Sequence, residues 1–416
     1  YSVFDEARYF SKGTEPNTLF WYDDIAIGIN ICEDIWIEDG PAEEQVKQGA
    51  SLIININASP YDIHKSETRK EIVMKKALKL NVPIIYLNMV GGQDELVFDG
   101  GSFVVNDLGE IIYQASSFKE EVFHLDIDLK TNKQNDKSPL IIRPKTIELK
   151  DVESKASLSK NESIYSALKL GLKDYVRKNK FTKVLIGISG GIDSALTAAI
   201  CVDALGAENV IGVAMPSKYN SKDSLDDAIK LSDNLGITLK TIEIEKLVDD
   251  FRETLTNSLN EDLGQITDEN IQSRVRGNIL MGLSNQTGAM VVSTGNKSEM
   301  AVGYSTLYGD LAGGFALIKD LYKTKVYELS NYINSISDAI PKNIITKEPS
   351  AELRPNQFDS DSLPDYEVLD KILNLYIEED SSSEKIIASG VDPNLVFDVL
   401  EKVDRNEYKR KQVAPG

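Results

Sequence analysis

The strongest constraint on the fold is a pair of glycines between an apolar segment and a helical one. Residues 183–188 have the composition of a buried strand, and the run Ser-Gly-Gly-Ile-Asp-Ser follows directly at 189–194. Paired glycines at a strand end, just before a helix, form a nest of backbone N–H groups that suits a phosphate. The run lacks the Gly-Lys-Ser/Thr ending of a Walker loop and carries Asp193 where Mg²⁺ can bind. An ordinary glycine turn is the alternative, but the flanking serines and the aspartate favour a pyrophosphate-binding loop.

Length and charge exclude several classes of protein. A chain of 416 residues predicts two or three domains. Its 46 basic and 66 acidic side chains give a formal charge of −20, which argues against nucleic-acid binding. No apolar run reaches the roughly 18 to 20 residues that cross a bilayer, and no signal peptide is visible. We therefore expect a cytoplasmic protein with no membrane partner.

The cysteines and histidines are few. Cys32 and Cys201 alone exclude a disulfide framework and a multi-cysteine zinc site, and a reducing cytoplasm fits this usage. His64 and His124 leave little room for a histidine metal cluster or a Ser-His-Asp triad. The chain begins at Tyr1 without a methionine, so we expect a fragment that lacks its natural N-terminus.

Composition divides the chain into two α/β parts. Residues 1–129 alternate β-rich segments (25–32, 52–57, 83–90, 102–105 and 111–114) with helical ones (43–48 and 66–80). Residues 130–162 are rich in Lys, Asn, Asp, Ser and Pro and are expected to form a linker. Residues 163–416 begin with a helical pattern at 163–178. Strands at 183–188, 210–215 and 238–244 then alternate with helices at 194–205 and 221–235, which predicts a doubly wound parallel sheet.

Polar residues follow one further strand of this second part. Residues 289–293 read as a buried strand, and the run 294–299 ends in Glu299. In a doubly wound sheet this strand end can lie beside the glycine loop, so we expect Asp193 and Glu299 to hold Mg²⁺ together. Lys323 stands at the start of a helical segment, where it opposes the helix dipole unless an anion binds there. A solvated lysine is the alternative for Lys323, and a solvated surface acid is the alternative for Glu299.

These motifs resemble the synthetase domain of the NAD synthetase family, over residues 163–416. The matching runs are 187–194, 270–276, 293–299, 347–350 and 408–410. The glycine loop alone is also compatible with GMP synthetases, asparagine synthetases and tRNA-thiolating enzymes. The runs at 294–299 and 347–349 favour the NAD branch, whose implied reaction adenylates the nicotinate carboxylate of deamido-NAD and then lets ammonia displace AMP.

The resemblance also implies roles for individual residues in that reaction. Asp193 and Lys323 would be catalytic, and Asp193 and Glu299 would hold Mg²⁺. Asn270, Arg274, Glu299 and Lys409 would contact deamido-NAD. ATP would be bound by Gly187, Ile188, Ser189, Gly190, Gly191, Ile192, Asp193, Ser194, Thr294, Lys323 and Ser350.

The first part resembles the nitrilase-type amidase domain that is fused to bacterial glutamine-dependent NAD synthetases. Residues 3–10, 30–36, 57–61 and 94–102 carry this resemblance. It implies that Cys32, at the end of an apolar strand, attacks glutamine to form a thioester and release ammonia. Tyr1, Ser59 and Lys65 match positions that hold glutamine. The family's catalytic glutamate and lysine would precede Tyr1, so we expect little glutaminase activity from this chain.

The sequence therefore predicts a ligase that makes NAD from deamido-NAD, ATP and ammonia or glutamine. The expected fold is a truncated nitrilase-like αββα sandwich followed by a doubly wound, adenine nucleotide alpha hydrolase-like domain. A homo-oligomer is expected from the resemblance. Two alternatives stay open here. One is another adenylating amidotransferase, such as a GMP synthetase, and the other is a carbon–nitrogen hydrolase whose second domain binds a nucleotide only for regulation.

Overall fold

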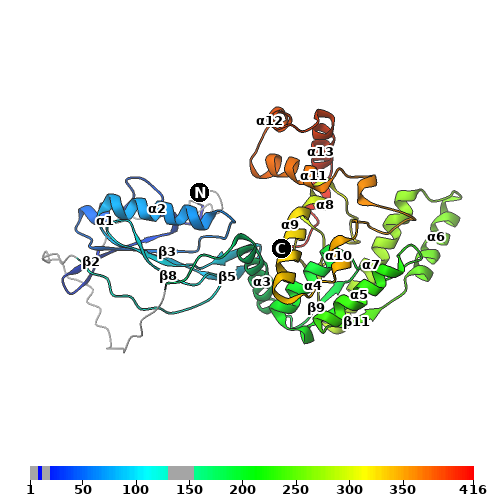
Figure 1. The fold of residues 1–416 in the computed structure, drawn as a ribbon, viewed down its shortest axis with the longest axis horizontal. Helices are drawn as coiled ribbons and strands as arrows, with labels where there is room; N and C mark the ends of the chain where they lie inside the picture. The colour runs from blue at the N-terminus through cyan, green and yellow to red at the C-terminus, as the bar shows by residue number, and fades with distance from the viewer. Residues whose placement is uncertain (1–7, 12–18, 130–153) are drawn as a thin grey trace. The chain divides into compact units, whose positions relative to one another are not determined.

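Two compact units make up the chain. The computed structural model describes residues 8–11, 19–129 and 154–416, and the division between the units falls within helix α3 (Lys160–Lys178) (Figure 1). Most of the expected linker, residues 130–153, lies outside the described residues. Helix α3 begins at Lys160, which is three residues before the expected start at 163.

The first unit is built on a mixed six-stranded sheet in the order β1-β2-β3-β4-β7-β8. Strands β2, β3 and β4 run parallel, whereas β1, β7 and β8 join antiparallel neighbours. A turn at 106–109 connects β7 and β8. The bounds are β1 (Leu19–Tyr22), β2 (Ile25–Ile31), β3 (Leu52–Asn57), β4 (Ile84–Asn88), β7 (Phe103–Val105) and β8 (Ile111–Gln114), and β5 (Val90–Gln93) pairs separately with β6 (Leu96–Asp99).

Helices α1 (Pro41–Lys47) and α2 (Lys65–Leu80) lie along one face of this sheet in Figure 1. Alternate strand residues point into the layer that they cover, and Ile53, Ile84, Tyr86 and Phe103 are buried there with Val73 of α2. Burying apolar side chains stabilises such a layer at about 25 cal/mol for each Å² removed from water. The layer fixes β2 and β3, whose carboxyl ends carry the candidate residues of this unit.

The second unit contains the expected doubly wound sheet. Its five strands are all parallel and lie in the order β11-β10-β9-β12-β13, so β9 (Val184–Gly187) and β12 (Met290–Ser293) are neighbours. The chain order reverses at β9, which is the switch point where ligands bind in such sheets. The other strands are β10 (Val210–Ala214), β11 (Thr238–Thr241) and β13 (Phe315–Ala316).

Helices of this unit connect the strands and then form a separate cluster near the C-terminus. Both loops at the switch point open helices, α4 after β9 and α8 after β12. Leu369, Ile372, Val396 and Val399 are fully buried in the cluster that packs against α8. The bounds are α4 (Ile192–Leu205), α5 (Lys222–Leu235), α6 (Glu245–Leu259), α7 (Gln265–Thr287), α8 (Lys297–Val302), α9 (Lys323–Ser337), α10 (Lys342–Thr346), α11 (Tyr366–Leu373), α12 (Ser383–Ala388), α13 (Pro393–Arg405) and α14 (Glu407–Arg410).

Among the residues described here, no helix is both long and apolar enough to cross a bilayer. Each unit combines helices with a β-sheet, so the α/β class expected from the sequence is confirmed.

Candidate active site

The glycine loop connects β9 to α4 in a conformation that requires glycine. Gly190 has φ +80°, and a Cβ atom at this position would lie 2.2 Å from the carbonyl oxygen of Ser224. Within the loop, the Gly191 N–H donates to Ser189 Oγ at 3.1 Å, and the buried Ser194 Oγ donates to the Gly191 carbonyl at 2.9 Å. The two serines that flank the glycines therefore shape the backbone of the loop.

A cavity of about 570 Å³ opens over this loop. Most of the residues expected to bind ATP, metal or deamido-NAD line it, although they come from distant parts of the chain. The lining includes residues 187–193 with Asn270, Thr294, Glu299, Lys323, Ser350 and Lys409.

Lys323 joins the two acids that the sequence predicts to lie together. Its Nζ is 2.6 Å from Asp193 Oδ2 and 3.2 Å from Glu299 Oε1, and its side chain is only 3 % exposed. The same Nζ lies 5.2 Å from the centroid of the Tyr366 ring, within the range of a cation–π contact. The solvated alternatives for Lys323 and Glu299 are therefore wrong.

The charges of this cluster follow from its burial. Burial raises the pKa of Glu299 to about 8; Asp193 and Asp359 also raise it, and Lys323 opposes the shift. Burial lowers the pKa of Lys323, but the carboxylates of Asp193 and Glu299 outweigh this effect and raise it well above its usual value. At neutral pH we therefore assign a charged Lys323 with a protonated Glu299 beside it.

Asn296 connects the glycine loop to the end of β12. Its Nδ2 donates to Asp193 Oδ1 at 2.9 Å, and its Oδ1 accepts from the Glu299 N–H at 3.0 Å as the N-cap of α8. One side chain therefore orients both acids toward Lys323. Among the described residues, no group of three His, Cys, Asp or Glu side chains could hold a metal alone. Two carboxylates beside a phosphate loop still fit Mg²⁺, which commonly takes its remaining ligands from phosphates and water.

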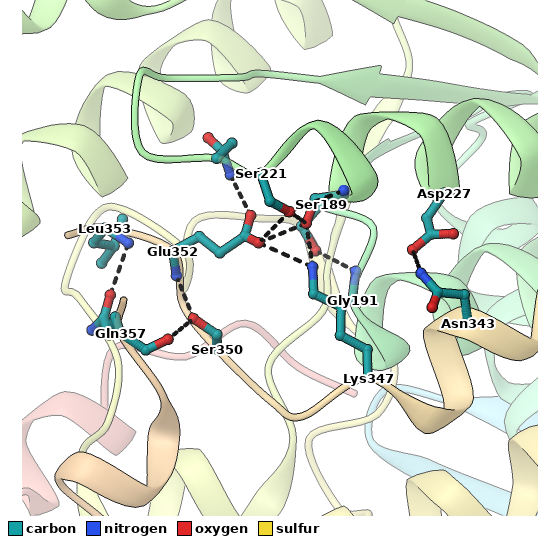
Figure 2. A network of polar contacts seen from close by, with 12 residues as sticks. Ser189, Gly191, Ser221, Asp227, Asn343, Lys347, Ser350, Glu352, Leu353 and Gln357 are labelled. Atoms are coloured by element: carbon teal, nitrogen blue, oxygen red, sulfur yellow. Dashed lines mark hydrogen bonds and ion pairs between the residues drawn. The ribbon is translucent and has the colours of Figure 1, made fainter. Parts of the chain in front are cut away.

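A second polar network lies beside the glycine loop and was not predicted (Figure 2). The Glu352 carboxylate accepts from Ser224 Oγ at 2.7 Å, Lys347 Nζ at 3.0 Å, Asn220 Nδ2 at 2.8 Å and Ser221 Oγ at 3.1 Å. Burial opposes these contacts, but they lower the pKa of Glu352 overall. The acid therefore stays charged at the N-terminus of α5, where the helix dipole favours an anion.

Ser350 connects this network to the rest of its loop. Its Oγ donates to the Gln357 carbonyl and accepts from the Glu352 N–H at 3.1 Å. Gln357 Oε1 in turn accepts from the Leu353 N–H at 2.8 Å (Figure 2). Sequence reasoning selected Ser350 from the run at 347–350 but missed Lys347 and Glu352. The sequence feature that could have indicated them is a pair of opposite charges, Lys347 and Glu352, five positions apart on either side of a proline.

Two predicted residues of this unit, Ser194 and Arg274, lie outside the cavity lining, whereas Asn270 and Lys409 belong to it. Asn270 Oδ1 accepts from Thr306 Oγ1 at 2.8 Å, and Lys409 Nζ donates to the carbonyls of Gly303 and Ser305 at 2.7 and 2.8 Å. Arg274 is exposed and outside the lining, so its binding role stays a prediction.

Arg276, two positions along α7 from Arg274, lines the cavity instead. Its Nε donates to the Met215 carbonyl at 3.1 Å, and one terminal nitrogen donates to Asn220 Oδ1 at 3.1 Å. Burial lowers the pKa of Arg276 to about 10, against the influence of Glu352 and Glu245. The run at 270–276 contained this residue, but spacing alone did not distinguish the two arginines.

Cys32 lies at a strained turn in the first unit. It ends the apolar strand β2 and begins the short 3-10 helix Cys32–Ile35, with φ +48°. Such a φ is unfavourable for a residue with a side chain, and strain of this kind is common at reactive positions. Asn55 Nδ2 donates to Asn30 Oδ1 at 2.7 Å and to the Cys32 carbonyl at 3.2 Å. Cys201, in contrast, is fully buried in α4, and burial raises the pKa of its thiol.

Ser59 and Lys65 lie in the same unit as Cys32. Ser59 Oγ accepts from Arg69 Nε at 3.1 Å, and Arg69 Nη1 donates to both carboxylate oxygens of Asp99, at 2.7 and 2.9 Å, in a buried ion pair. Lys65, the first residue of α2, has its Nζ 5.8 Å from the centroid of the Trp36 ring, next to the Cys32 turn. Tyr1 lies outside the described residues. The glutamine-binding roles of these residues stay predictions.

Comparisons with known proteins match both units. A family model described as NAD synthase matches residues 164–413, and one described as carbon-nitrogen hydrolase matches residues 2–135. The chain is 48 % identical over 436 residues to a glutamine-dependent NAD(+) synthetase of Thermotoga maritima, and 46 % identical over 432 residues to one of Aquifex aeolicus. Each match covers 100 % of this chain and 76 % of the relative.

One solved structure is similar along the same span. It is the glutamine-dependent NAD+ synthetase of Acinetobacter baumannii in complex with adenosine diphosphate, which is 44 % identical with a TM-score of 0.75. The match covers 100 % of this chain and 74 % of that one.

Proposed function

The chain belongs to the family of glutamine-dependent NAD(+) synthetases, ligases that combine an amidase domain with an NAD synthase domain, and from this membership we propose the residues that carry its chemistry. The observation that carries the proposal is Lys323 Nζ held between Asp193 and Glu299 over the glycine loop. Family membership favours NAD synthesis over both alternatives, the GMP synthetase-like enzyme and the hydrolase with a regulatory nucleotide site.

We assign ATP to the cavity over the glycine loop. The backbone of residues 187–194 would hold the phosphates at the N-terminus of α4, with Thr294 and Ser350 in contact with the nucleotide. Lys323 would stabilise the negative charge that develops on the pyrophosphate as the nicotinate carboxylate attacks the α-phosphorus. Ammonia then displaces AMP from the adenylate. A carboxylate is a poor acceptor for ammonia until adenylation provides a leaving group, so alignment and charge stabilisation dominate the catalysis.

Asp193 and Glu299 would hold Mg²⁺ when ATP is bound. The ion supplies positive charge to the departing pyrophosphate. Lys323 contacts both acids, so it is expected to move toward the phosphates as the ion binds. Glu299 must then lose its proton, since metal ligands bind as carboxylates.

Deamido-NAD is assigned to the same cavity. Asn270, Glu299 and Lys409 line it, and the half-buried Arg276 adds a cation to this lining. A dinucleotide with two phosphates and a carboxylate needs such positive charge, because the overall charge of −20 repels it. Arg274, which lies outside this lining, remains a candidate contact from the sequence alone.

The first unit is assigned the supply of ammonia. Cys32 would attack the carboxamide carbon of glutamine, forming a thioester as ammonia leaves, with Ser59 and Lys65 binding the amino acid. Tyr1 is proposed to join them. A homo-oligomer and a cytoplasmic location also stay predictions.

The proposed function is tested by measuring NAD made from deamido-NAD, ATP and Mg²⁺, with either ammonia or glutamine. We expect turnover with ammonia that D193N lowers by at least about 100-fold, because charge stabilisation at a reacting phosphate is worth that much. D203N is the matched control, since Asp203 lies on the same helix and its carboxylate pairs with Lys169 at the surface. C32A should remove any glutamine-supported turnover that the wild-type chain shows and leave ammonia-supported turnover intact. Failure of the folded wild-type protein to make NAD with ammonia would overturn the proposal.

A further inference from the structure

Lys323 occupies an unfavourable position in its own helix. It is the first residue of α9, and a cation in the first turn opposes the positive N-terminal end of the helix dipole. Asp193 and Glu299 compensate the ammonium group, but they do not hold the backbone that carries it. Some other group must fix the first turn of α9 so that Nζ reaches both acids.

Asp370 of α11 provides this contact. Its Oδ2 accepts from the Thr324 N–H at 2.9 Å, directly at the first turn of α9. Its Oδ1 accepts from Ser298 Oγ, and the same Ser298 Oγ accepts from the Lys323 N–H at 2.9 Å. One carboxylate therefore holds the backbone N–H groups of Lys323 and Thr324, one through a serine and one directly.

The same contact also fixes the residue next to Glu299. Ser298 lies in the first turn of α8, between Asn296 and Glu299. Asp370 and Ser298 are both almost fully buried, at 5 % and 0 % exposure, so solvent does not compete for these hydrogen bonds. Burial raises the pKa of Asp370, whereas the bonds from Ser298 and Thr324 lower it. Asp370 is thus the point where the first turns of α8 and α9 meet the C-terminal helices.

We propose that Asp370 is a positioning residue for the phosphate and metal site, acting through Ser298 to place Lys323 and Glu299 relative to each other. It does not line the cavity and touches no substrate. A carboxylate next to the first turn of α9 also interacts favourably with the helix dipole, which offsets the unfavourable position of the Lys323 cation. The kinetic test of this proposal rests on the proposed function. The measurement of Tm does not depend on that function.

The kinetic test compares D370N with the wild type in ammonia-dependent NAD formation. Asparagine keeps the size of the side chain, but only its amide oxygen can accept a hydrogen bond, whereas both carboxylate oxygens of Asp370 accept one. We expect kcat to fall about 10- to 100-fold, as for outer groups that orient ligands, with little change in KM for deamido-NAD. S298A serves as a second variant if D370N does not fold, since it removes the link to Lys323 and leaves the bond to Thr324.

A double-mutant cycle separates positioning from general stability. Because Asp370 acts through Lys323, the K323M/D370N double variant should be no less active than K323M alone, within about threefold. D227N is the control. Asp227 is a buried acid of α5 that accepts from Asn343 Nδ2 at 2.6 Å (Figure 2), so its effect should multiply with that of K323M. The losses in Tm of the ligand-free variants should also be less than additive, although the coupling is weaker there because the bonds of Asp370 to Ser298 and Thr324 do not involve the Lys323 side chain.

Three results are informative. Independent, multiplying effects of D370N and K323M overturn the positioning role, and so does a kcat for D370N within about twofold of the wild type. If the wild-type protein makes no NAD with ammonia, the proposed function fails. In that case the Tm cycle alone still decides whether Asp370 acts through Lys323.

Discussion

Replacing Lys323 by methionine removes the cation between Asp193 and Glu299 and keeps the length of the side chain. The loss leaves the Asp193 carboxylate, which is only 17 % exposed, without its cationic partner, and breaking a buried pair from one side costs about 3–5 kcal/mol. The lower end applies here, because Asp193 is partly exposed and still accepts a hydrogen bond from Asn296. For a domain of this size, about 2–4 °C are lost for each kcal/mol. We therefore expect the Tm of the second unit to fall by about 6–12 °C.

Scanning calorimetry in EDTA, without nucleotide, measures this change. The matched control is K325M. Lys325 lies on the same helix and forms an i,i+3 ion pair with Glu328, whose side chain is 52 % exposed. Such pairs contribute at most about 1 kcal/mol, so the control should lose no more than about 4 °C.

Added Mg²⁺ gives a second readout. A divalent cation can compensate the two acids that K323M leaves together, so Mg²⁺ should raise the Tm of K323M more than that of the wild type. Equal losses for K323M and K325M would refute the buried charge cluster, and so would a K323M protein that Mg²⁺ does not stabilise.

Three further predictions follow from single contacts. Burial raises the pKa of Glu299 from 4.5 to about 8. Between these pH values the folded protein keeps a proton that the unfolded chain has already lost. Its stability therefore falls across that window as pH rises, and the Tm of E299Q relative to wild type should increase from pH 5 to 9; parallel curves would contradict this. G190A should lower Tm by at least about 5 °C more than G191A. A Cβ atom at Gly190 would lie 2.2 Å from a backbone oxygen in a positive-φ conformation, whereas the nearest atom to a Cβ at Gly191 is a serine hydroxyl at 3.2 Å. Equal Tm values for the two variants would exclude the clash. Iodoacetamide, followed by mass spectrometry, should label Cys32 in the native protein and leave Cys201 unlabelled until denaturant is added, and early labelling of Cys201 would show that α4 is not packed as described.

Local sequence pattern predicted the parts of the fold that depend on local physics. The strands at 52–57 and 111–114 were predicted with their observed bounds, because β-branched runs there end at polar residues. The switch point at β9 followed from the alternation of strands and helices. Asp193 and Glu299 were predicted to lie near each other, since a doubly wound sheet brings two strand ends together there, but their connection through Lys323 was not predicted.

The sequence did not predict what depends on tertiary packing. Arg276 and Arg274 differ by two positions on α7, and only the observed packing shows which one enters the cavity. Glu352 and Asp370 read as ordinary surface acids, because their partners are 128 and 72 positions away, at Ser224 and Ser298. Side-chain contacts over such distances leave no periodic signal in one sequence.

The adjacency of β9 and β12 also has a consequence for how the protein folds. Asp193 and Asn296 are 103 positions apart, and the segment between them contains the three helices α5, α6 and α7 and the three strands β10, β11 and β12 of the same unit. The entropy of closing so long a loop opposes their meeting until most of that segment is ordered. The nucleotide site should thus be among the last features to form during refolding. A fluorescent ATP analogue added to refolding protein should bind only in the slowest phase, after helical circular dichroism has recovered.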